Sequence, residues 1–441
     1  MNDLHYDVIV VGGGPGGSSA ATILAQKGYR VLLLEKEHFP RFHIGESLLP
    51  ASWDIWDRLG VTAQIESAGF TVKQGVSFGL FQAPQDLILL TAEFPEYFVR
   101  PYTFHVERAH FDKVLLDNAR KHGVEVREGV AVKDVLTRES QVVGVLAAAE
   151  GEPAQSIGAR VVVDATGRSC LLARKFGWRK PDPALNKIAY FTHFSGAYRR
   201  RNEDERFSDS TMTDIHTIDG GWLWYIPLAG ELVSVGAVVD SQWVGAQGQG
   251  AQARFDAAVA SSPKLAGWLR DAQQKMEVQT ISSISYLNDR FVGDGFVLVG
   301  DACMFIDPIF SAGVTLAMRG GVFAADAIDK ALIAGDVSAA QLQAYEDAIR
   351  IPMSRIFPMI YNWYDILAKK DPDNLFVRSQ RIPLLRERLI VLLSGGYDRV
   401  DMDALMQDAS PTSSPVTLDS AHSAINRRKV KGQAHPPGKE D

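Results

Sequence analysis

Residues 6–35 read YDVIVVGGGPGGSSAATILAQKGYRVLLLE, a pattern that is typical of an α/β nucleotide-binding fold. The apolar run 6–11 is typical of a buried parallel strand, and the small-residue stretch 18–28 that follows the glycines is typical of a helix. A second strand is predicted where the chain continues with YRVLLLEK. A glycine-rich turn between a strand and a helix is the fingerprint of a dinucleotide-binding βαβ unit.

Each residue of the fingerprint has a physical role. Gly12 permits the tight turn, Gly14 lets the backbone approach a pyrophosphate at the positive helix N-terminus, and Gly17 allows close packing of the helix. Glu35 ends the second strand, where its carboxylate can accept hydrogen bonds from ribose hydroxyls. Nicotinamide and flavin dinucleotides share this pattern, so the pattern leaves the choice between them open.

Composition excludes several classes of protein. The 441 residues suit two domains, and the net charge of −7 disfavours a nucleic-acid binder. Cys170 and Cys303 form neither a CxxC pair nor a zinc motif, and the histidines are isolated, so we expect no metal and a reducing, cytoplasmic setting. The first apolar run leads into glycines and no later run approaches about 18 residues, so neither a signal peptide nor a membrane span is predicted.

Further strand-like runs at 124–134, 142–148, 159–164 and 295–299 indicate that the nucleotide-binding domain is split along the chain. We place it at 1–75, 104–180 and 286–335. Aromatic and β-branched residues dominate the region between, which predicts an inserted, mainly antiparallel sheet as the substrate domain, at 76–103 and 181–285. A long helix is expected from Gly313 to about Ala334, then a helical region at 336–405 punctuated by prolines, and a disordered tail at 406–441.

Three further segments indicate that the dinucleotide is a flavin and not a nicotinamide. VVVDATGR (161–168), GFVLVGDACMFIDPIFSAG (295–313) and VERAHFDKVLL (106–116) resemble FAD motifs of the para-hydroxybenzoate-hydroxylase-like superfamily. The resemblance implies an α/β fold, with a Rossmann-like FAD-binding domain, an antiparallel-sheet insertion and a helical C-terminal region. It implies that Asp301 hydrogen-bonds the ribityl chain, that Arg41 and Arg108 flank the flavin or its diphosphate, and that the Val132 backbone lies near the adenine.

Two motifs narrow the resemblance to flavin-dependent halogenases. WLWYIP (222–227) fits the halogenase motif W-x-W-x-I-P, and Phe305-x-x-Pro308-x-x-Ser311-x-Gly313 fits F-x-x-P-x-x-S-x-G. The resemblance implies that the backbone amides of Ala312 and Gly313 hold a halide, and that Trp222 and Trp224 separate flavin from substrate. An anion is also favoured there by the N-terminus of the following helix.

The segment GFTVKQGVSF (69–78) resembles the lysine segment of halogenases that act on phenols and pyrroles. These relatives also share FHIGESLLP (42–50), which adds Ser47 to the candidates for the cofactor site. The resemblance implies that reduced FAD and O2 oxidise chloride or bromide to hypohalous acid. Lys73 then holds this reagent, by a hydrogen bond or as a chloramine, and aims it at one ring carbon.

Tryptophan halogenases carry a glutamate immediately before the serine of the turn, where this chain has Phe310. The resemblance therefore favours a phenol or pyrrole substrate, free or tethered to a carrier protein, over free tryptophan. The lysine segment also departs from many relatives, since it continues with FGLF (78–81) instead of an aromatic residue and tryptophan. No second nicotinamide fingerprint is visible, which implies that a separate flavin reductase supplies FADH2.

Two other interpretations stay open at this stage. One is a monooxygenase or reductase of the same fold that oxidises NAD(P)H itself, in which Lys73 is incidental. The other is a catalytically silent flavoprotein that binds a partner. Halide dependence and reaction with oxygen distinguish them from a halogenase. His105 is a minor candidate for a base that faces the substrate.

Overall fold

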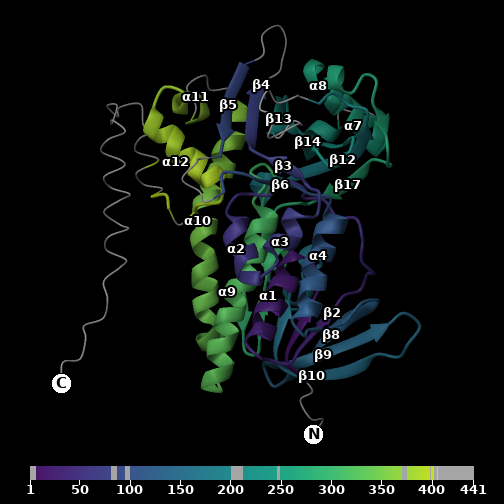
Figure 1. Ribbon diagram of the computed structural model, residues 1–441, viewed down its shortest axis with the longest axis vertical. Coiled ribbons are helices and arrows are strands. Elements are labelled where there is room, and N and C mark those ends of the chain that lie inside the picture. Colours follow the sequence, from purple (N-terminus) through teal and green to yellow (C-terminus); the bar gives the residue numbers. More distant parts are fainter. Residues whose placement is uncertain are drawn as a thin grey trace, which may run out of the picture.

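The computed structural model describes residues 6–80, 87–94, 100–199, 212–245, 249–369, 375–397, 399–401 and 405. Two sheets dominate these residues. One lies in the lower half of the molecule as drawn, with helices packed against it, and the other lies in the upper half (Figure 1). The tail predicted at 406–441 lies outside the described residues.

The lower sheet is built on the N-terminal fingerprint. Strand β1 (Tyr6–Val11) lies between β2 (Val31–Leu34) and β10 (Gln155–Asp164), parallel to both. The sheet continues through β20 (Phe296–Leu298) and the short β19 (Val292–Gly293) on one side, and through β7 (Glu125–Arg127) on the other. An antiparallel pair, β8 (Val130–Arg138) and β9 (Gln141–Ala149), extends from β10. The strands of this sheet therefore come from three separate parts of the sequence.

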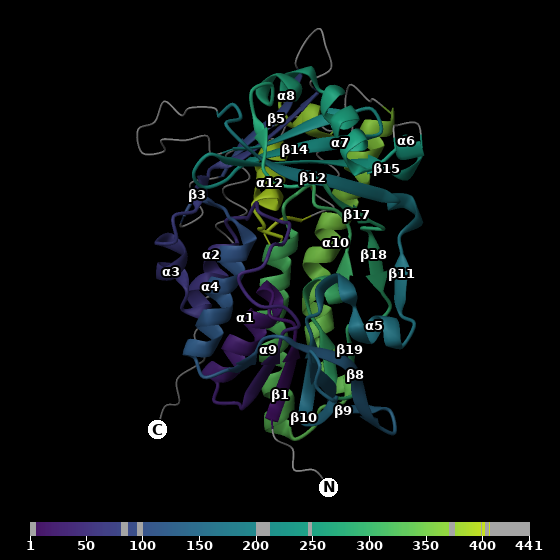
Figure 2. The same cartoon turned by 90° about the vertical axis from the view of Figure 1, so that its right-hand side faces the viewer.

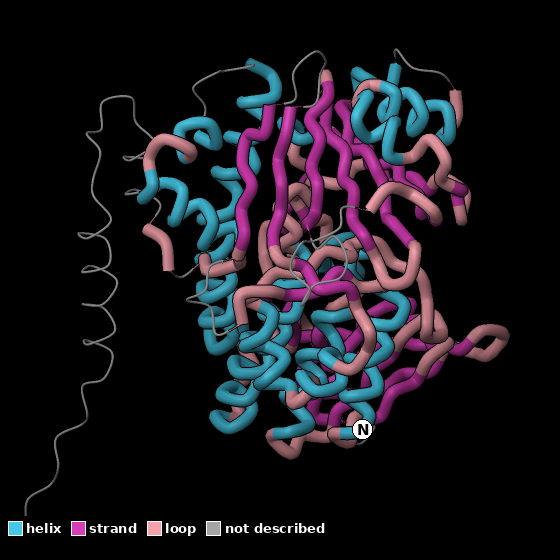
Figure 3. The backbone as a smooth tube through the Cα atoms, turned by 45° about the horizontal axis from the view of Figure 1, so that its top comes forward, coloured by secondary structure: helices cyan, strands magenta, loops and turns pink. Residues whose placement is uncertain are grey.

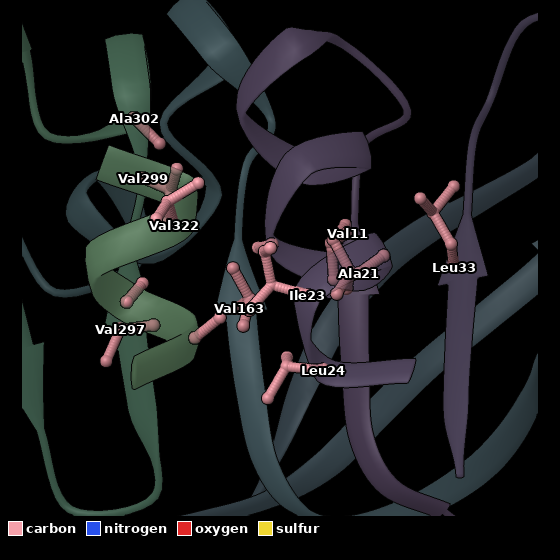
Figure 4. Packing of buried hydrophobic residues seen from close by; sticks show 14 of the residues in the cluster. Val11, Ala21, Ile23, Leu24, Leu33, Val163, Val297, Val299, Ala302 and Val322 are labelled. Atoms are coloured by element: carbon pink, nitrogen blue, oxygen red, sulfur yellow. The ribbon is translucent and has the colours of Figure 1, made fainter. Parts of the chain in front are cut away.

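Helix α1 (Pro15–Gln26) packs against α4 (Arg108–Lys121) and α9 (Gly313–Ala334). Small residues make this approach possible, because a Cβ on Gly321 would lie 2.3 Å from the Gly16 carbonyl oxygen. Figure 4 shows Ile23 and Leu24 of α1 beside Val163 of β10, and Val322 of α9 beside Val297 and Val299. These apolar residues are buried between sheet and helices and form the main core.

The upper sheet contains seven strands in one path and an eighth, β17 (Gln279–Ser282), beside β12. The path runs through β16 (Gln273–Gln274), β12 (Lys187–Ser195), β15 (Leu232–Asp240), β14 (Gly221–Pro227), β13 (Met212–Ile218), β4 (Gly75–Leu80) and β5 (Leu87–Glu93). All neighbours are antiparallel except β4 and β13, which are parallel. The expectation of a mainly antiparallel sheet is therefore confirmed, with one parallel pair where the two chain segments meet. Figure 3 shows these strands side by side.

Smaller elements connect the two sheets. Strands β3 (Thr71–Lys73) and β6 (Thr103–His105) form an antiparallel pair between the sheets, above α2 (Ser52–Leu59) and α3 (Thr62–Glu66). A three-stranded sheet consists of β11 (Arg179–Pro181), β18 (Tyr286–Asn288) and β21 (Met304–Phe305). The remaining short helices are α5 (Leu171–Lys175), α6 (Ser241–Gly245), α7 (Ala251–Ala260) and α8 (Pro263–Trp268), with 3-10 turns at Gly167–Ser169, Pro183–Leu185 and Gly300–Ala302.

The C-terminal region is helical, as expected, but the prolines act differently from the prediction. Helix α10 (Ala339–Lys369) runs beside α9 (Figure 2) and continues through Pro352 and Pro358, which were expected to interrupt it. Each proline removes a backbone donor. Burial of Met353, Ile356 and Trp363 against the rest of the protein outweighs that loss. Helices α11 (Leu375–Ser379) and α12 (Pro383–Leu393) follow.

The fold is the predicted α/β class, with a Rossmann-like sheet, an inserted sheet and a helical C-terminal region. The exact domain boundaries stay predictions. Within the described residues, no helix has the length and apolar character needed to cross a bilayer. The same residues contain no group of three or more His, Cys, Asp or Glu side chains arranged to hold a metal ion.

Candidate active site

A cavity of about 700 Å³ lies between the two sheets, at the carboxyl end of β1. Open α/β sheets bind ligands at this end of their strands. Most of the predicted site residues line it: Gly12, Gly14, Glu35, Arg41, Ser47, Arg108, Val132, Trp222, Trp224, Asp301 and Gly313. The tertiary structure therefore brings these segments, which are far apart in the sequence, around one space.

The glycine turn needs its glycines for steric reasons. Gly12 has a φ of +107°, and a Cβ there would lie 2.3 Å from the Ala165 carbonyl oxygen. A Cβ on Gly17 would lie 2.0 Å from the Gly12 carbonyl oxygen, so Gly17 serves packing and does not line the cavity. Gly14 is the N-cap of α1, and no acidic side chain stands in the first turn. The helix N-terminus is thus free to attract an anion such as a pyrophosphate.

Glu35 stands at the edge of this turn with a fixed carboxylate. Its Oε2 accepts a hydrogen bond of 2.7 Å from the Gly13 N–H, and its Oε1 accepts one of 2.9 Å from the Glu37 N–H. Each carboxylate oxygen has a further lone pair. Glu35 can therefore still accept from a sugar hydroxyl within the cavity.

A buried carboxylate holds the two predicted arginines. Asp112 accepts two hydrogen bonds from Arg108, at 2.7 and 2.9 Å, and one of 3.1 Å from Arg41. Burial acts to raise the pKa of Asp112, but the charges and hydrogen bonds of Arg108 and the charge of Arg41 together keep that pKa below its usual value. Arg108 also donates to the Ile44 carbonyl at 2.7 Å, so it fixes the loop that carries Ser47. The arginines are held in place by Asp112 before any ligand binds.

Asp301 lies in the turn that follows β20. Burial raises its pKa to about 6, against the opposing effect of Arg168. The backbone at this point is held by the Tyr286 hydroxyl, which donates to the Asp301 carbonyl at 2.7 Å. The carboxyl group therefore sits at a fixed place on the cavity wall, where it can bind polyol hydroxyls. Val132, on β8, lines the same cavity through a backbone segment that includes Val130 and Ala131.

The turn at 305–313 ends where α9 begins. Ser311 has a φ of +55°, a conformation that non-glycine residues rarely adopt, and Ala312 is the N-cap of the helix. Ala312 does not line the large cavity. It lines a smaller apolar cavity together with Gly313, and Gly313 lines both. The N-terminus of α9 thus faces the space between the two cavities, which is favourable for an anion.

Trp222 and Trp224 point to the same face of β14, with ring centres 6.0 Å apart. Each indole is held by a hydrogen bond. The Trp222 Nε1–H donates to the Tyr364 hydroxyl at 3.0 Å, and the Trp224 Nε1–H donates to Ser234 at 3.1 Å. Because both indoles line the large cavity, they form a rigid wall on the side of the upper sheet.

Lys73 lies outside the lining of both cavities. Its side chain is 1% exposed, and its Nζ donates a hydrogen bond of 2.9 Å to the Leu48 carbonyl. Burial lowers its pKa to about 7, because no ion pair among the described residues compensates for the loss of water. Lys73 is therefore a buried amine that can lose its proton near neutral pH. Its hydrogen-bond partner, Leu48, directly follows Ser47 in the sequence.

A chain of hydrogen bonds that sequence reasoning missed runs beside Lys73. The Ser311 hydroxyl donates to Ser47 at 3.1 Å, and Ser47 and Thr213 share a hydrogen bond of 2.9 Å. Thr213 shares another of 2.9 Å with the Nε2 of His105. Burial lowers the pKa of His105 well below its usual value, and the Lys73 charge adds to this effect. His105 is thus a neutral, buried partner of Thr213, and it does not line the large cavity. The role of Thr213 could not be predicted from the sequence, because Thr213 belongs to none of the sequence motifs.

The site fits FAD. The glycine turn leaves room that a Cβ would fill, the N-terminus of α1 faces the cavity, and acceptors for sugar hydroxyls stand at Glu35 and Asp301. The volume lies within the usual range for cofactor sites. Gly14 would lie at the pyrophosphate of FAD. Arg41 and Arg108 would lie beside the pyrophosphate or beside the flavin ring.

Comparisons with known proteins agree with a site that holds FAD. The sequence pattern of the tryptophan halogenase family matches residues 7–91 and 90–383. The chain is similar to the 1H-pyrrole-2-carbonyl peptidyl-carrier protein chlorinase of Pseudomonas fluorescens, with 33% identity over 415 residues that cover 90% of each protein. It is also similar to the tryptophan 2-halogenase of Chondromyces crocatus, with 33% identity over 434 residues, 97% of this chain and 79% of that protein.

The solved structure of the flavin-dependent brominase Bmp2 superposes with a TM-score of 0.77 and 30% identity, over 96% of this chain and 99% of that chain. The family match spans the glycine turn, the Lys73 segment, the two tryptophans and the turn before α9. These are the segments that the fold gathers around or beside the cavity. The chain belongs to the tryptophan halogenase family and is a flavin-dependent halogenase that uses FAD.

Proposed function

We propose that this enzyme uses FADH2, O2 and chloride or bromide to halogenate an electron-rich aromatic ring, a phenol or a pyrrole. The observation that carries the proposal is the buried amine of Lys73, with a pKa of about 7, beside a cavity that fits FAD. A lysine that served only as a surface charge would stay in water, because burying its charge without an ion pair costs free energy. Such burial is common where a lysine must react as a neutral amine.

Bound as reduced flavin, FAD supplies the chemistry that, with O2, converts a halide to hypohalous acid. The chain's own residues hold the reactants. The backbone amides of Ala312 and Gly313, at the positive end of α9, are proposed to bind the halide. Trp222 and Trp224 close the cavity toward the upper sheet and keep the aromatic substrate away from the flavin.

Lys73 directs the reagent. In one form its neutral amine holds hypohalous acid by a hydrogen bond. In the other the amine nitrogen forms a bond to the halogen, an N–H bond and the O–halogen bond break, and water leaves. The ring then takes the halogen, the ring carbon loses its proton, and the amine returns to its starting state. The chloramine form needs an unprotonated amine, which the pKa of about 7 makes available near neutral pH.

We infer the substrate class from Phe310, the residue before Ser311, which lines neither cavity and packs among aromatic rings. Its ring lies 6.1 Å from Phe78 and 6.5 Å from Phe376, and Trp363 lies 5.3 Å from Phe78. These buried rings offer no charged partner to the ammonium and carboxylate of a free amino acid. They favour a neutral ring. The name of the Pseudomonas fluorescens relative supports a pyrrole delivered on a carrier protein, whereas that of the Chondromyces crocatus relative makes tryptophan the rival to test.

A separate flavin reductase is proposed to supply FADH2, since the chain carries one dinucleotide fingerprint, at Gly12–Gly17. The deciding experiment mixes the purified protein with FAD, a flavin reductase, NADH, O2 and either chloride or bromide. Three parallel reactions contain, as the compound to be halogenated, a small trapping phenol, a pyrrole on a carrier protein, or free tryptophan. Halide-dependent product on the phenol or pyrrole supports the proposal. Product on tryptophan alone overturns the substrate class, and peroxide without any halogenated product overturns the activity.

A further inference from the structure

Asp307 lies in the turn before α9, and its carboxyl group is buried in a network that links three elements. The Tyr364 hydroxyl of α10 donates to Asp307 Oδ2 at 2.7 Å and accepts from the Trp222 Nε1–H of β14 at 3.0 Å. Asp307 Oδ1 accepts from the Ile309 N–H at 2.9 Å. One carboxyl group therefore fixes both the turn and, through Tyr364, the indole on the cavity wall.

Within the described residues, no ion pair neutralises the charge of this carboxyl group. The cation that acts on it is Lys187 of β12, whose Nζ lies 4.0 Å from the centre of the Tyr364 ring and is paired with Asp240 of β15. Asp301 is the other acidic residue on the wall of the small cavity. Tyr364, Lys187, Asp240 and Asp301 are thus ionisable groups near Asp307, and Cys303 lines the same small cavity. Burial raises the pKa of Asp307 to about 7, although Tyr364, the Ile309 N–H and Lys187 act in the opposite direction.

Asp307 shares the wall of the small cavity with Ala312 and Gly313, whose amides are the proposed halide site. An ionised carboxylate in this apolar space repels a second anion, and a protonated carboxyl does not. We propose that Asp307 is a positioning residue for the halide, which sets the affinity of the 305–313 turn through its charge and through its hydrogen bond with Tyr364. The inference rests on the halide site of the proposed function.

The sign of the pH dependence follows. Below pH 7 Asp307 is protonated and the turn binds halide, whereas above pH 7 it ionises and binding weakens. If the protonated form alone binds halide, the apparent KM for halide rises about tenfold between pH 6 and pH 8. By linkage, halide binding at pH 8 takes up close to one proton, roughly 0.9, and at pH 6 it takes up roughly 0.1.

The first test uses the wild-type holoenzyme with oxidised FAD and no reductant, so it does not depend on turnover. Bromide is titrated calorimetrically at pH 6 and pH 8, each in two buffers of different ionisation enthalpy, which gives the number of protons taken up. We expect weaker binding and near-stoichiometric proton uptake at pH 8. Bromide binding of equal strength at both pH values, or without proton uptake at pH 8, overturns the inference.

The second test assigns the titrating group. Asp307→Asn keeps the size and the acceptor oxygen but cannot ionise, so the tenfold change between pH 6 and pH 8 should disappear. Tyr364→Phe removes a donor that lowers the Asp307 pKa, so the midpoint of the pH dependence should move upward. Asp256→Asn, an exposed carboxylate on α7, is the matched control and should keep the wild-type profile. A pH dependence that survives Asp307→Asn would assign the effect to another group such as Asp301.

The outcomes separate this inference from the proposed function. Absence of any halogenated product at any pH removes the proposed function and this inference with it. Halogenation with a halide KM that does not change with pH removes only the role of Asp307. The wild-type proton count remains decisive if Asp307→Asn does not fold.

Discussion

The Nζ of Lys73 is hydrogen-bonded to the carbonyl oxygen of Leu48, at 2.9 Å. Leu48 directly follows Ser47, which lines the large cavity and is hydrogen-bonded to Thr213 and Ser311. The lysine is therefore attached to the back of the cavity wall, one residue away from the space that fits FAD. The lysine itself does not line the cavity.

Replacement of Lys73 by alanine should abolish regioselective halogenation of the enzyme-bound substrate, because no amine remains to hold the hypohalous acid. Unselective halogenation of a trapping phenol by free hypohalous acid should persist. FAD affinity and production of hypohalous acid should stay largely intact, since Lys73 lines neither cavity. Product is measured by chromatography, hypohalous acid with a trapping phenol, and FAD affinity by fluorescence titration. Lys121→Met, an exposed lysine in α4, is the control. Retained regioselective halogenation in Lys73→Ala would remove Lys73 from the mechanism.

Lys73 should also make stability depend on pH. Its pKa is about 7 in the folded protein and about 10.4 in the unfolded chain, so the unfolded state binds an extra proton between these values. The free energy of unfolding should therefore rise from pH 7 to pH 10, relative to Lys73→Met, by at most about 3.5 kcal/mol. Denaturant titrations of both proteins at pH 7, 8.5 and 10 measure this difference. A constant difference would mean that the amine is already solvated in the folded state.

Gly17→Ala should disrupt the dinucleotide turn, because its Cβ would lie 2.0 Å from the Gly12 carbonyl oxygen and the backbone must move. We expect FAD to be lost and the melting temperature to fall. Gly267→Ala is the matched control, since a Cβ there meets no atom within 4 Å and the residue lies in helix α8. If Gly17→Ala binds FAD as tightly as Gly267→Ala, the turn does not hold the pyrophosphate.

Asp301→Ala should weaken FAD binding by about 1–3 kcal/mol, roughly 5- to 150-fold, because the hydrogen bond that a ribityl hydroxyl donates to the buried carboxylate is lost. Asp301→Asn should lose less, since the amide can still bind hydroxyls. Titration of the apoprotein with FAD measures both affinities at pH 8, where the carboxyl group is ionised. Unchanged affinity in Asp301→Ala would show that the ribityl assignment is wrong.

The fold was largely predictable because its signals are local. The spacing of Gly12, Gly14 and Gly17 reflects contacts within one βαβ unit, and a sequence pattern records such contacts directly. The same holds for the strand before Asp301 and the helix after Ala312. The prolines of α10 were misjudged because helix-breaking propensity is local, whereas the burial of Met353 and Trp363 that overrides it is not.

The residue types and their spacing were enough to establish the dinucleotide turn, the two halogenase motifs and the candidate lysine. Tertiary packing added what spacing cannot record: that Lys73 is buried behind Ser47, that Thr213 joins Ser47 to His105, and that Tyr364 joins Trp222 to Asp307. These partners are 142 residues apart for Trp222 and Tyr364, and 166 for Ser47 and Thr213. A pKa depends on burial and on charges brought close by the fold, so the states of Lys73 and Asp307 follow from the folded protein and not from their neighbours in the sequence.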